Sequence, residues 1–157
     1  MGIEIERKFL VNGDGWRRDI QRSSEYRQGY LVLGGPTSVR VRVADDRANL
    51  NIKSGKLSIR RLEYEYEIPM EEAVEMLDNL CTGSVVEKTR HFVRHGGHTW
   101  EIDVFAGDNQ GLVVAEIELQ DEQEAFERPD WLGKEVSVDA RYYNVSLSTH
   151  PYREWGE

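Results

Sequence analysis

Charged residues occupy every second position through much of this chain, and no other feature limits its fold as strongly. The stretch EIERKFL, residues 4–10, shows the pattern, with Glu4, Glu6 and Lys8 at alternate positions. Side chains of a β-strand point alternately to opposite faces. The stretch is therefore predicted to form a strand with charge on one face, while Ile5 and its alternate neighbours lie on the other.

The clearest hairpin is predicted for VEKTRHFVRHGGHTWEIDVF, residues 86–105. Its centre, Gly96-Gly97, suits the positive backbone angles of a two-residue turn. Pairing outward from this turn places Arg90 opposite Asp103, and Lys88 falls on the same face as both. The opposite face carries the apolar residues of the second strand.

A second hairpin is predicted for SVRVRVADDRANLNIKS, residues 38–54. With a four-residue turn, Arg40 would lie opposite Lys53 and Arg42 opposite Asn51. This register groups three cations on one face. Further strands are predicted for RRLEYEYEI and LVVAEIEL, which both carry carboxylates at alternate positions.

Three helical segments interrupt the strands. Apolar residues at helical spacing predict a helix over residues 70–80, directly after Pro69. Asp139 suits the N-cap of a short terminal helix that runs to about Ser148. A further short helix is predicted over residues 122–128.

The composition is that of one domain. At 157 residues the chain can bury a core without disulfides, and its single cysteine, Cys81, cannot form an internal bridge. The formal net charge of -9 argues against broad binding to nucleic acid. No targeting segment and no apolar run of membrane-spanning length is present, so a cytoplasmic protein without a membrane partner is expected. A homodimer is left open.

Charge at alternate strand positions admits two architectures. In an antiparallel sandwich the apolar faces pack together and the charged faces contact water. In a closed barrel with a polar interior, the apolar faces lie under helices and no sheet edge is exposed. The pattern alone does not choose between them.

Acids and bases are segregated by strand, which favours charged ligands. Glu4 and Glu6 would lie about 7 Å apart on one strand face, so their repulsion costs roughly 2 kcal/mol. A magnesium or manganese ion would remove this cost, because both prefer hard oxygen ligands. Arginine forks on the basic strands match phosphate oxygens. Together the two sets indicate a site for a metal-bound polyphosphate.

An ordered series of segments carries a family resemblance. The series is EIERK at residues 4–8, QGYL at 28–31, RVR at 40–42, IKS around Lys53, EYE at 63–65, KTR at 88–90, Asp103, EIE at 116–118 and EVSVDARYYNVSL at 135–147. It resembles the CYTH family, the triphosphate tunnel metalloenzymes, in which ExExK is a signature. The resemblance implies an α+β fold in a single domain over residues 1–157. Its core would be an eight-stranded antiparallel closed β-barrel, a tunnel with a charged interior, covered by helices and plugged by a C-terminal helix.

The resemblance also implies an activity. The chain looks most like the short bacterial tripolyphosphatases, which implies hydrolysis of inorganic tripolyphosphate to pyrophosphate and phosphate. A metal-activated water would attack in line, with two Mg²⁺ or Mn²⁺ ions during turnover. The alternatives are a thiamine or nucleoside triphosphatase, a class IV adenylate cyclase, and a binder of polyphosphate without catalysis.

Site residues follow from the matched positions. The implied metal ligands are Glu4, Glu6, Glu63, Asp103, Glu116 and Glu118. The implied substrate ligands are Lys8, Tyr30, Arg40, Arg42, Lys53, Arg61, Lys88 and Arg90. The candidates for the catalytic step are Lys8, Glu65 and Glu116. Lys8 is expected either to bind phosphate or to transfer a proton with a pKa lowered by cationic neighbours.

Two other features are interpreted as ordinary. His91, His95 and His98 are predicted to be surface residues and not a zinc site, because no fourth ligand is evident. Cys81 is predicted to be a small buried residue and not a nucleophile, because no activating neighbour is evident.

Overall fold

The computed structural model describes residues 2–33, 35–54 and 58–156. The strands are β1 (Ile3–Val11), β2 (Ile20–Val32), β3 (Thr37–Ala44), β4 (Arg47–Ser54), β5 (Arg60–Glu67), β6 (Thr82–His95), β7 (His98–Phe105), β8 (Val113–Glu118) and β9 (Leu132–Glu135). The α-helices are α1 (Met70–Asn79) and α2 (Asn144–Leu147). Short 3₁₀ helices cover Gly15–Asp19, Gly107–Asn109, Ala140–Tyr142 and Tyr152–Glu154.

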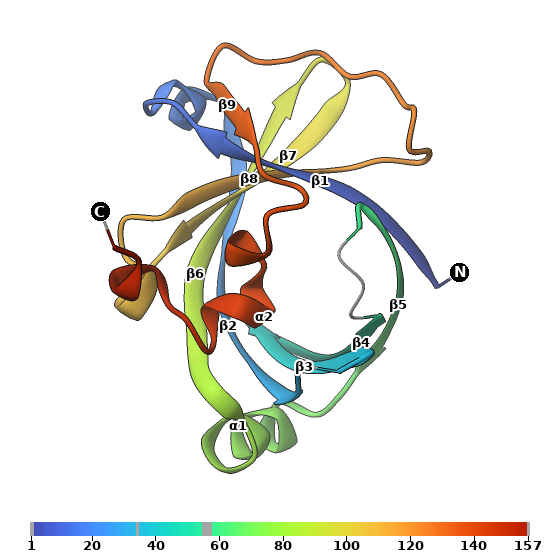
Figure 1. Cartoon of the computed structure of the whole chain (residues 1–157), viewed down its shortest axis with the longest axis vertical. Coiled ribbons are helices and arrows are strands. Elements are labelled where there is room, and N and C mark those ends of the chain that lie inside the picture. Colours follow the sequence, from blue (N-terminus) through green and yellow to red (C-terminus); the bar gives the residue numbers. More distant parts are fainter. Residues whose placement is uncertain (1, 34, 55–57, 157) are drawn as a thin grey trace.

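Eight antiparallel strands close into a barrel, as Figure 1 shows. The order is β5-β4-β3-β2-β6-β7-β8-β1, and the circle closes where β1 pairs with β5 through Ile3 and Leu62. The additional strand β9 pairs with the last part of β1. The predicted eight-stranded barrel is confirmed, and the sandwich alternative is wrong.

The barrel has its charged residues inside and its apolar cores outside. The first core lies on the outer faces of β1, β7 and β8, where Phe9, Trp16 and Trp100 are buried. The second lies between β6 and the C-terminal segment, around Leu147. The third lies under α1, whose Ala73 packs on β3 and β4. Each fully buried large apolar side chain stabilises the fold by about 1.5–3 kcal/mol, so these cores offset the cost of a charged interior.

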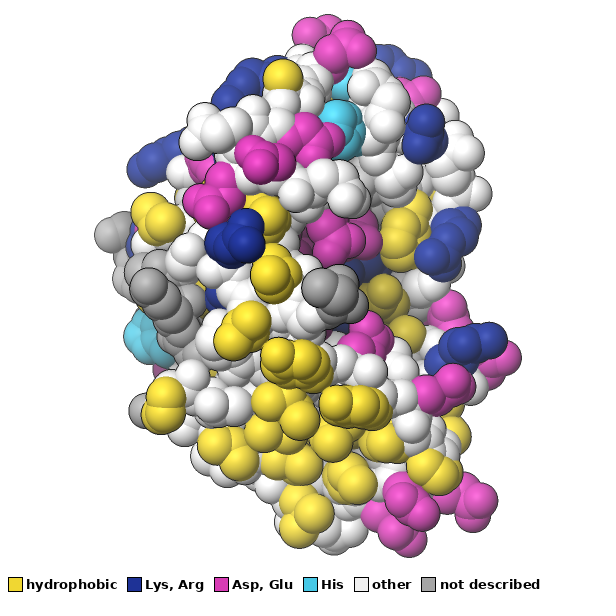
Figure 2. Space-filling view, turned by 90° about the vertical axis from the view of Figure 1, so that its right-hand side faces the viewer, with side chains coloured by type: hydrophobic (Ala, Val, Ile, Leu, Met, Phe, Trp, Pro, Cys, Tyr) yellow, Lys and Arg dark blue, Asp and Glu magenta, His cyan; other side chains and the backbone are white. Residues whose placement is uncertain are grey.

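The cover over the barrel is incomplete. Ile3, Leu62, Tyr64 and Tyr66 are large apolar residues of β1 and β5 that remain exposed. Figure 2 shows apolar side chains gathered on this side of the molecule. The predicted cover of helices is therefore present on the α1 side and thin over β5.

One hairpin has the predicted register and the other does not. In β6–β7, Arg90 pairs with Asp103 across the turn at Gly96-Gly97, as predicted. In β3–β4, Arg40 pairs with Asn51, because the turn has two residues and not four. Its first residue, Asp45, has a φ of 57°, a conformation that Asp tolerates. The shift of two residues keeps every side chain on its predicted face.

Two of the three helix predictions need correction. The helix over residues 70–80 is confirmed as α1. The terminal helix is broken, because Asp139 caps only the turn at Ala140–Tyr142 and Tyr143 is extended before α2 begins. The Tyr143 hydroxyl donates to the Ser137 carbonyl oxygen at 2.7 Å, which fixes this break.

The helix predicted over residues 122–128 does not form. Phe126 in this segment packs edge-on against Trp100 and Phe9, with centroids 5.6 and 6.0 Å apart. Glu124 bonds to His98 at 2.7 Å. Contacts with the barrel therefore hold this segment in an irregular conformation and override its helix propensity.

Candidate active site

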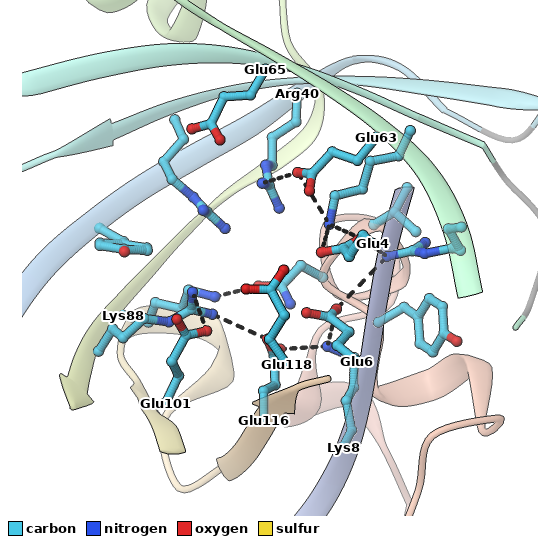
Figure 3. A pocket seen from close by; sticks show the side chains of 18 of the residues that line it. Glu4, Glu6, Lys8, Arg40, Glu63, Glu65, Lys88, Glu101, Glu116 and Glu118 are labelled. Carbon is cyan, nitrogen blue, oxygen red and sulfur yellow. Dashed lines mark hydrogen bonds and ion pairs between the residues drawn. The ribbon is translucent and has the colours of Figure 1, made fainter. Parts of the chain in front are cut away.

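A cavity of about 310 Å³ lies inside the barrel (Figure 3). Every predicted site residue except Asp103 lines it: Glu4, Glu6, Lys8, Tyr30, Arg40, Arg42, Lys53, Arg61, Glu63, Glu65, Lys88, Arg90, Glu116 and Glu118. They come from the seven strands β1 to β6 and β8, and closure of the barrel brings them together. Side chains alternate between the two faces of each strand. The apolar residues pack on the outside of the barrel, so the charged residues between them face the interior.

Strand pairing gathers carboxylates into an acidic wall of Glu4, Glu6, Glu101, Glu116 and Glu118. Glu6 lies opposite Glu118, and Glu101 lies opposite Glu116. Burial, followed by Glu101 and Glu6, raises the pKa of Glu118 to about 7. Burial and the Glu116 carboxylate raise the pKa of Glu6. The acidic wall thus holds more negative charge than its surroundings stabilise.

Lys8 lies within this wall and bonds to Glu116 at 2.5 Å. Burial alone would lower the pKa of Lys8, but the Glu116 and Glu6 carboxylates more than offset it and raise the pKa. The expectation of a pKa lowered by cationic neighbours is therefore wrong. Lys8 keeps its proton, which suits an anion ligand better than a proton acceptor.

Glu116 forms ion pairs with two cations, and its pKa is shifted in the opposite direction to those of Glu6 and Glu118. Besides Lys8, the Arg90 guanidinium lies 3.4 Å from it. Burial opposes ionisation, but these cations hold the pKa of Glu116 well below its usual range. Such a carboxylate is a weak proton acceptor.

A cationic wall of Arg40, Arg42, Lys88 and Arg90 faces the acidic wall. Burial, followed by the Arg40 and Arg90 charges, lowers the pKa of Arg42 to about 10, which leaves it charged near neutral pH. The ring of Tyr26 lies 4.6 Å from the Arg42 guanidinium carbon and 5.0 Å from that of Arg90. Cation–π contacts of this kind stabilise neighbouring guanidinium groups.

Asp103 lies behind the cationic wall and does not line the cavity. Its side chain is fully buried, and it accepts from Arg90 Nε at 2.7 Å, Arg90 Nη2 at 2.9 Å and Lys88 Nζ at 2.7 Å. Both carboxylate oxygens are thus occupied by cations. This geometry fits a residue that fixes two substrate ligands, and it leaves no oxygen directed at the cavity for a metal ion.

Two further cations lie on the acidic side. Lys53 Nζ lies 3.4 Å from Glu4 and 3.8 Å from Glu63. Arg61 lies 3.8 Å from Glu4 and 4.0 Å from Glu6. These distances are longer than those of direct charge-assisted hydrogen bonds, so both side chains have room to turn from a carboxylate to a phosphate oxygen.

The acidic wall has the chemistry that a divalent cation requires. Glu4 Oε1 is buried and accepts no hydrogen bond within the described residues, and its nearest cations are Lys53 at 3.4 Å and Arg61 at 3.8 Å. The raised pKa values of Glu6 and Glu118 show that an additional positive charge would stabilise this wall. Across residues 2–33, 35–54 and 58–156, no three carboxylate or other ligand groups already converge on one point. The donor set fits the ion, and the carboxylates would have to draw closer to bind it.

Comparison with known proteins gives the family. A model of the CYTH domain matches residues 2–150. The chain belongs to the CYTH family. It is 49% identical to an inorganic triphosphatase of Acetivibrio thermocellus over 157 residues, 100% of both chains. It is 40% identical to an inorganic triphosphatase of Nitrosomonas europaea over 154 residues, 92% of this chain and 96% of that one.

Solved CYTH structures share the architecture. The crystal structure of an inorganic triphosphatase matches with a TM-score of 0.66 and 36% identity, over 92% of this chain and 93% of that one. A putative adenylate cyclase from Bacillus halodurans matches with a TM-score of 0.57 and 15% identity, over 78% and 84% of the two chains. The second likeness concerns the fold alone.

Sequence reasoning missed several residues that line this CYTH cavity. Glu101 alternates with Trp100 and Ile102, so its position beside Asp103 on the charged face could have been inferred from the predicted hairpin. Its carboxylate lies 3.0 Å from Arg90. The other missed lining residues are Arg22, Tyr26, Ser38, Phe92, Tyr143, Asn144 and Val145. Tyr143 to Val145 come from the C-terminal plug, residues 139–148, and they line the cavity only because this segment docks on the barrel.

The histidines and the cysteine singled out in the sequence lie outside the cavity and are all partly buried. Within the described residues, His91, His95 and His98 form no metal site. His91 packs against Trp16, and His98 bonds to Glu124. Cys81 is partly buried, and burial raises the pKa of its thiol, so it is not activated as a nucleophile. No helix in the described part of the chain is long and apolar enough to span a membrane.

Proposed function

We propose that this CYTH protein hydrolyses inorganic tripolyphosphate to pyrophosphate and phosphate with the help of Mg²⁺ or Mn²⁺. The observation that carries the proposal is the cavity inside the closed barrel, in which an acidic wall faces a cationic wall. Such a site has room and charge for a short polyanion together with its counter-ions. Relatives that are 49% and 40% identical are inorganic triphosphatases, which supports the same substrate here.

Four cations, of which three are buried and Arg42 is partly buried, would grip the phosphate chain. Arg40, Arg42, Lys88 and Arg90 come from β2's two neighbours, β3 and β6, and all line the cavity. Asp103 fixes Lys88 and Arg90 from behind, so they are oriented before substrate arrives. Preorganised cations stabilise the charge that develops on the transferred phosphoryl group. Lys8, Lys53 and Arg61 would extend this grip to the acidic side.

The residues that would hold a divalent cation are Glu4, Glu6 and Glu118, with Glu63 near them. Triphosphatases of the CYTH family depend on metal ions, and an ion here supplies charge neutralisation to the phosphate oxygens and to the wall. Glu116 is assigned to holding Lys8 and Arg90 in place, because its lowered pKa makes it a weak base. Within the described residues Glu65 forms no ion pair, and it lies at the cavity edge. We assign to Glu65 the removal of a proton from the attacking water.

Hydrolysis of tripolyphosphate fits this cavity better than reactions of nucleotides. The best surface for a nucleotide base would be an aromatic ring on which it can stack. Arginines already cover three of the four aromatic rings that line the cavity: the guanidinium carbons of Arg42, Arg22 and Arg61 lie 4.6, 3.8 and 5.1 Å from the ring centroids of Tyr26, Phe92 and Tyr143. The fourth aromatic residue, Tyr30, is only 4% exposed. A nucleotide would have to displace these contacts.

The test is release of phosphate from tripolyphosphate, ATP and thiamine triphosphate, each with Mg²⁺, with Mn²⁺ and with EDTA. The ATP reaction is also assayed for cyclic AMP. We expect rapid, EDTA-sensitive hydrolysis of tripolyphosphate and much slower turnover of the other two. Tight binding of tripolyphosphate without turnover would instead identify a polyphosphate binder, and formation of cyclic AMP would identify a cyclase.

A further inference from the structure

One amide joins the C-terminal plug to the cationic wall. Asn144 is the first residue of α2, which Figure 1 shows in the C-terminal segment across the barrel end. Its Oδ1 accepts a hydrogen bond from Lys88 Nζ at 3.1 Å and another from Gln28 Nε2 at 2.9 Å. The Gln28 Oε1 in turn accepts from Arg42 Nε at 2.9 Å. A chain of three side chains thus links the plug to Arg42.

The donor groups of Arg42 and Lys88 fix the direction of every hydrogen bond in this series of side chains. Arginine and lysine donate hydrogen bonds and cannot accept them. Arg42 therefore requires the oxygen of Gln28, which turns the Gln28 amide nitrogen toward Asn144. That nitrogen donates to the Asn144 oxygen, as does the Lys88 ammonium group. Burial lowers the pKa of Lys88 to about 7, and the Gln28 donor fixes the Asn144 amide in either protonation state of Lys88. Both amides are oriented without ambiguity, and the Asn144 Nδ2 is left on the side away from these donors.

Burial makes this arrangement costly to disturb. Gln28 is fully buried, and Lys88 is only 3% exposed. A buried donor that loses its acceptor costs its full desolvation, more when it is charged. Removing the Asn144 oxygen would leave Gln28 and Lys88 each short of a partner, and both would shift to find another.

The position of Asn144 is set outside the cavity. Leu147 of the same helix is fully buried among Val86, Phe105 and Leu112. The Ser84 amide donates to the Ser148 carbonyl oxygen at 2.7 Å. The plug is therefore held against β6, and Asn144 transmits its position to the cationic wall.

We infer that Asn144 is a positioning residue, through which the docked C-terminal segment sets the places of Lys88 and Arg42 in the substrate site. The inference rests on the proposed function, since it concerns the grip on tripolyphosphate. A neutral acceptor suits this role because Asp103 already balances Lys88, and a second carboxylate would oppose the phosphate. The plug then does more than close the barrel: it completes the phosphate clamp.

The variants Asn144→Ala and Asn144→Asp separate positioning from folding. Asn144→Ala removes the acceptor, and we expect its KM for tripolyphosphate to rise about tenfold while kcat changes little. Asn144→Asp keeps the acceptor, so it should unfold near the wild-type temperature, yet its added charge should still raise KM about tenfold. Ser146→Ala, on the same helix but outside the cavity, is the matched control. A KM within about twofold of wild type for Asn144→Ala would overturn the inference, whatever the KM of Asn144→Asp.

A double-mutant cycle tests the chain itself. Gln28→Leu removes the middle link while keeping its volume, and it is measured alone and with Asn144→Ala. If the two residues act on Arg42 in series, the combined increase in KM is no larger than about that of the stronger single variant. Fully additive effects would mean that Asn144 and Gln28 act separately, which would refute the proposed connection from Asn144 through Gln28 to Arg42.

Binding without turnover distinguishes this inference from the proposed function. Calorimetric titration with tripolyphosphate in EDTA measures the grip of the cations alone. Weaker binding by Asn144→Ala than by wild type supports the inference even if the wild-type chain hydrolyses no tripolyphosphate, which would overturn only the proposed function. Equal binding by both proteins contradicts the inference whatever the activity.

Discussion

The two walls of the cavity hold buried charge in opposite ways. On the cationic wall, Lys88, Arg90 and Arg42 already have partners in Asp103, Asn144 and Gln28. On the acidic wall, Glu6 and Glu118 have raised pKa values, and Glu4 Oε1 accepts no hydrogen bond within the described residues. Most of the cationic wall is thus organised before any ligand arrives, although Arg40 Nε is buried without an acceptor among the described residues, whereas the acidic wall needs a cation to complete it.

The largest effect should come from removing a carboxylate of the acidic wall. Glu6→Gln is expected to reduce tripolyphosphate hydrolysis by on the order of a hundredfold or more, since even outer partners of metal ligands contribute 10- to 100-fold. The fold should persist, with an unfolding temperature equal to or above that of wild type, because a repelling charge is removed. Glu67→Gln, on β5 outside the cavity, is the control. Retained metal-dependent turnover in Glu6→Gln would refute the metal role.

On the cationic wall, Asp103→Asn should act on stability as well as activity. It leaves two buried cations with one neutral partner, and breaking a buried ion pair costs about 3–5 kcal/mol. Urea unfolding at neutral pH measures this loss. Asp108→Asn, which removes a surface pair with Arg153 at 3.1 Å, should cost less than about 1 kcal/mol. Equal stabilities for the two variants would contradict the positioning role of Asp103.

Removal of one organised cation should weaken binding more than chemistry. Arg42→Ala is expected to raise KM for tripolyphosphate about 10- to 100-fold, because hydrogen bonds to charged groups contribute about 1.5–3 kcal/mol. Steady-state kinetics measures the separate effects on KM and kcat. Arg47→Ala, at the exposed start of β4, should change neither. An unchanged KM for Arg42→Ala would count against the phosphate clamp.

The smallest effect is a pH dependence of metal binding at the acidic wall, in a range where Lys88 of the cationic wall, whose pKa is lowered to about 7 by burial, also titrates. The pKa of Glu118 is about 7, so below pH 7 this carboxyl is mainly protonated in the folded protein. A cation binds the ionised form, so metal affinity should rise with pH by up to about tenfold per unit below this pKa and level off above it. Calorimetry in buffers of different ionisation enthalpy should detect proton release. Glu118→Gln should lose that release, and a flat affinity from pH 6 to 8 in wild type would contradict the account.

The predictable part of the site is the part that depends on alternation. Glu4, Glu6 and Lys8 share a face because the side-chain period of a strand is two, and the same rule placed Arg90 beside Asp103. The error in the predicted β3–β4 turn did not change which face each side chain occupies, because it shifts the register by two residues. Glu101 was within reach of this reasoning and was overlooked.

The sequence by itself determined which residues face the interior, the family and most of the cavity lining, because these follow from periodicity and ordered motifs. Only the tertiary structure decided what each charge does. Asp103 and Glu6 are both acids on charged strand faces, yet one is held by two cations and the other is raised in pKa by burial and Glu116. Asn144 reaches Lys88 because the tail docks on β6. Charge interactions depend on distance and burial between residues far apart in the chain, and no local pattern records those quantities.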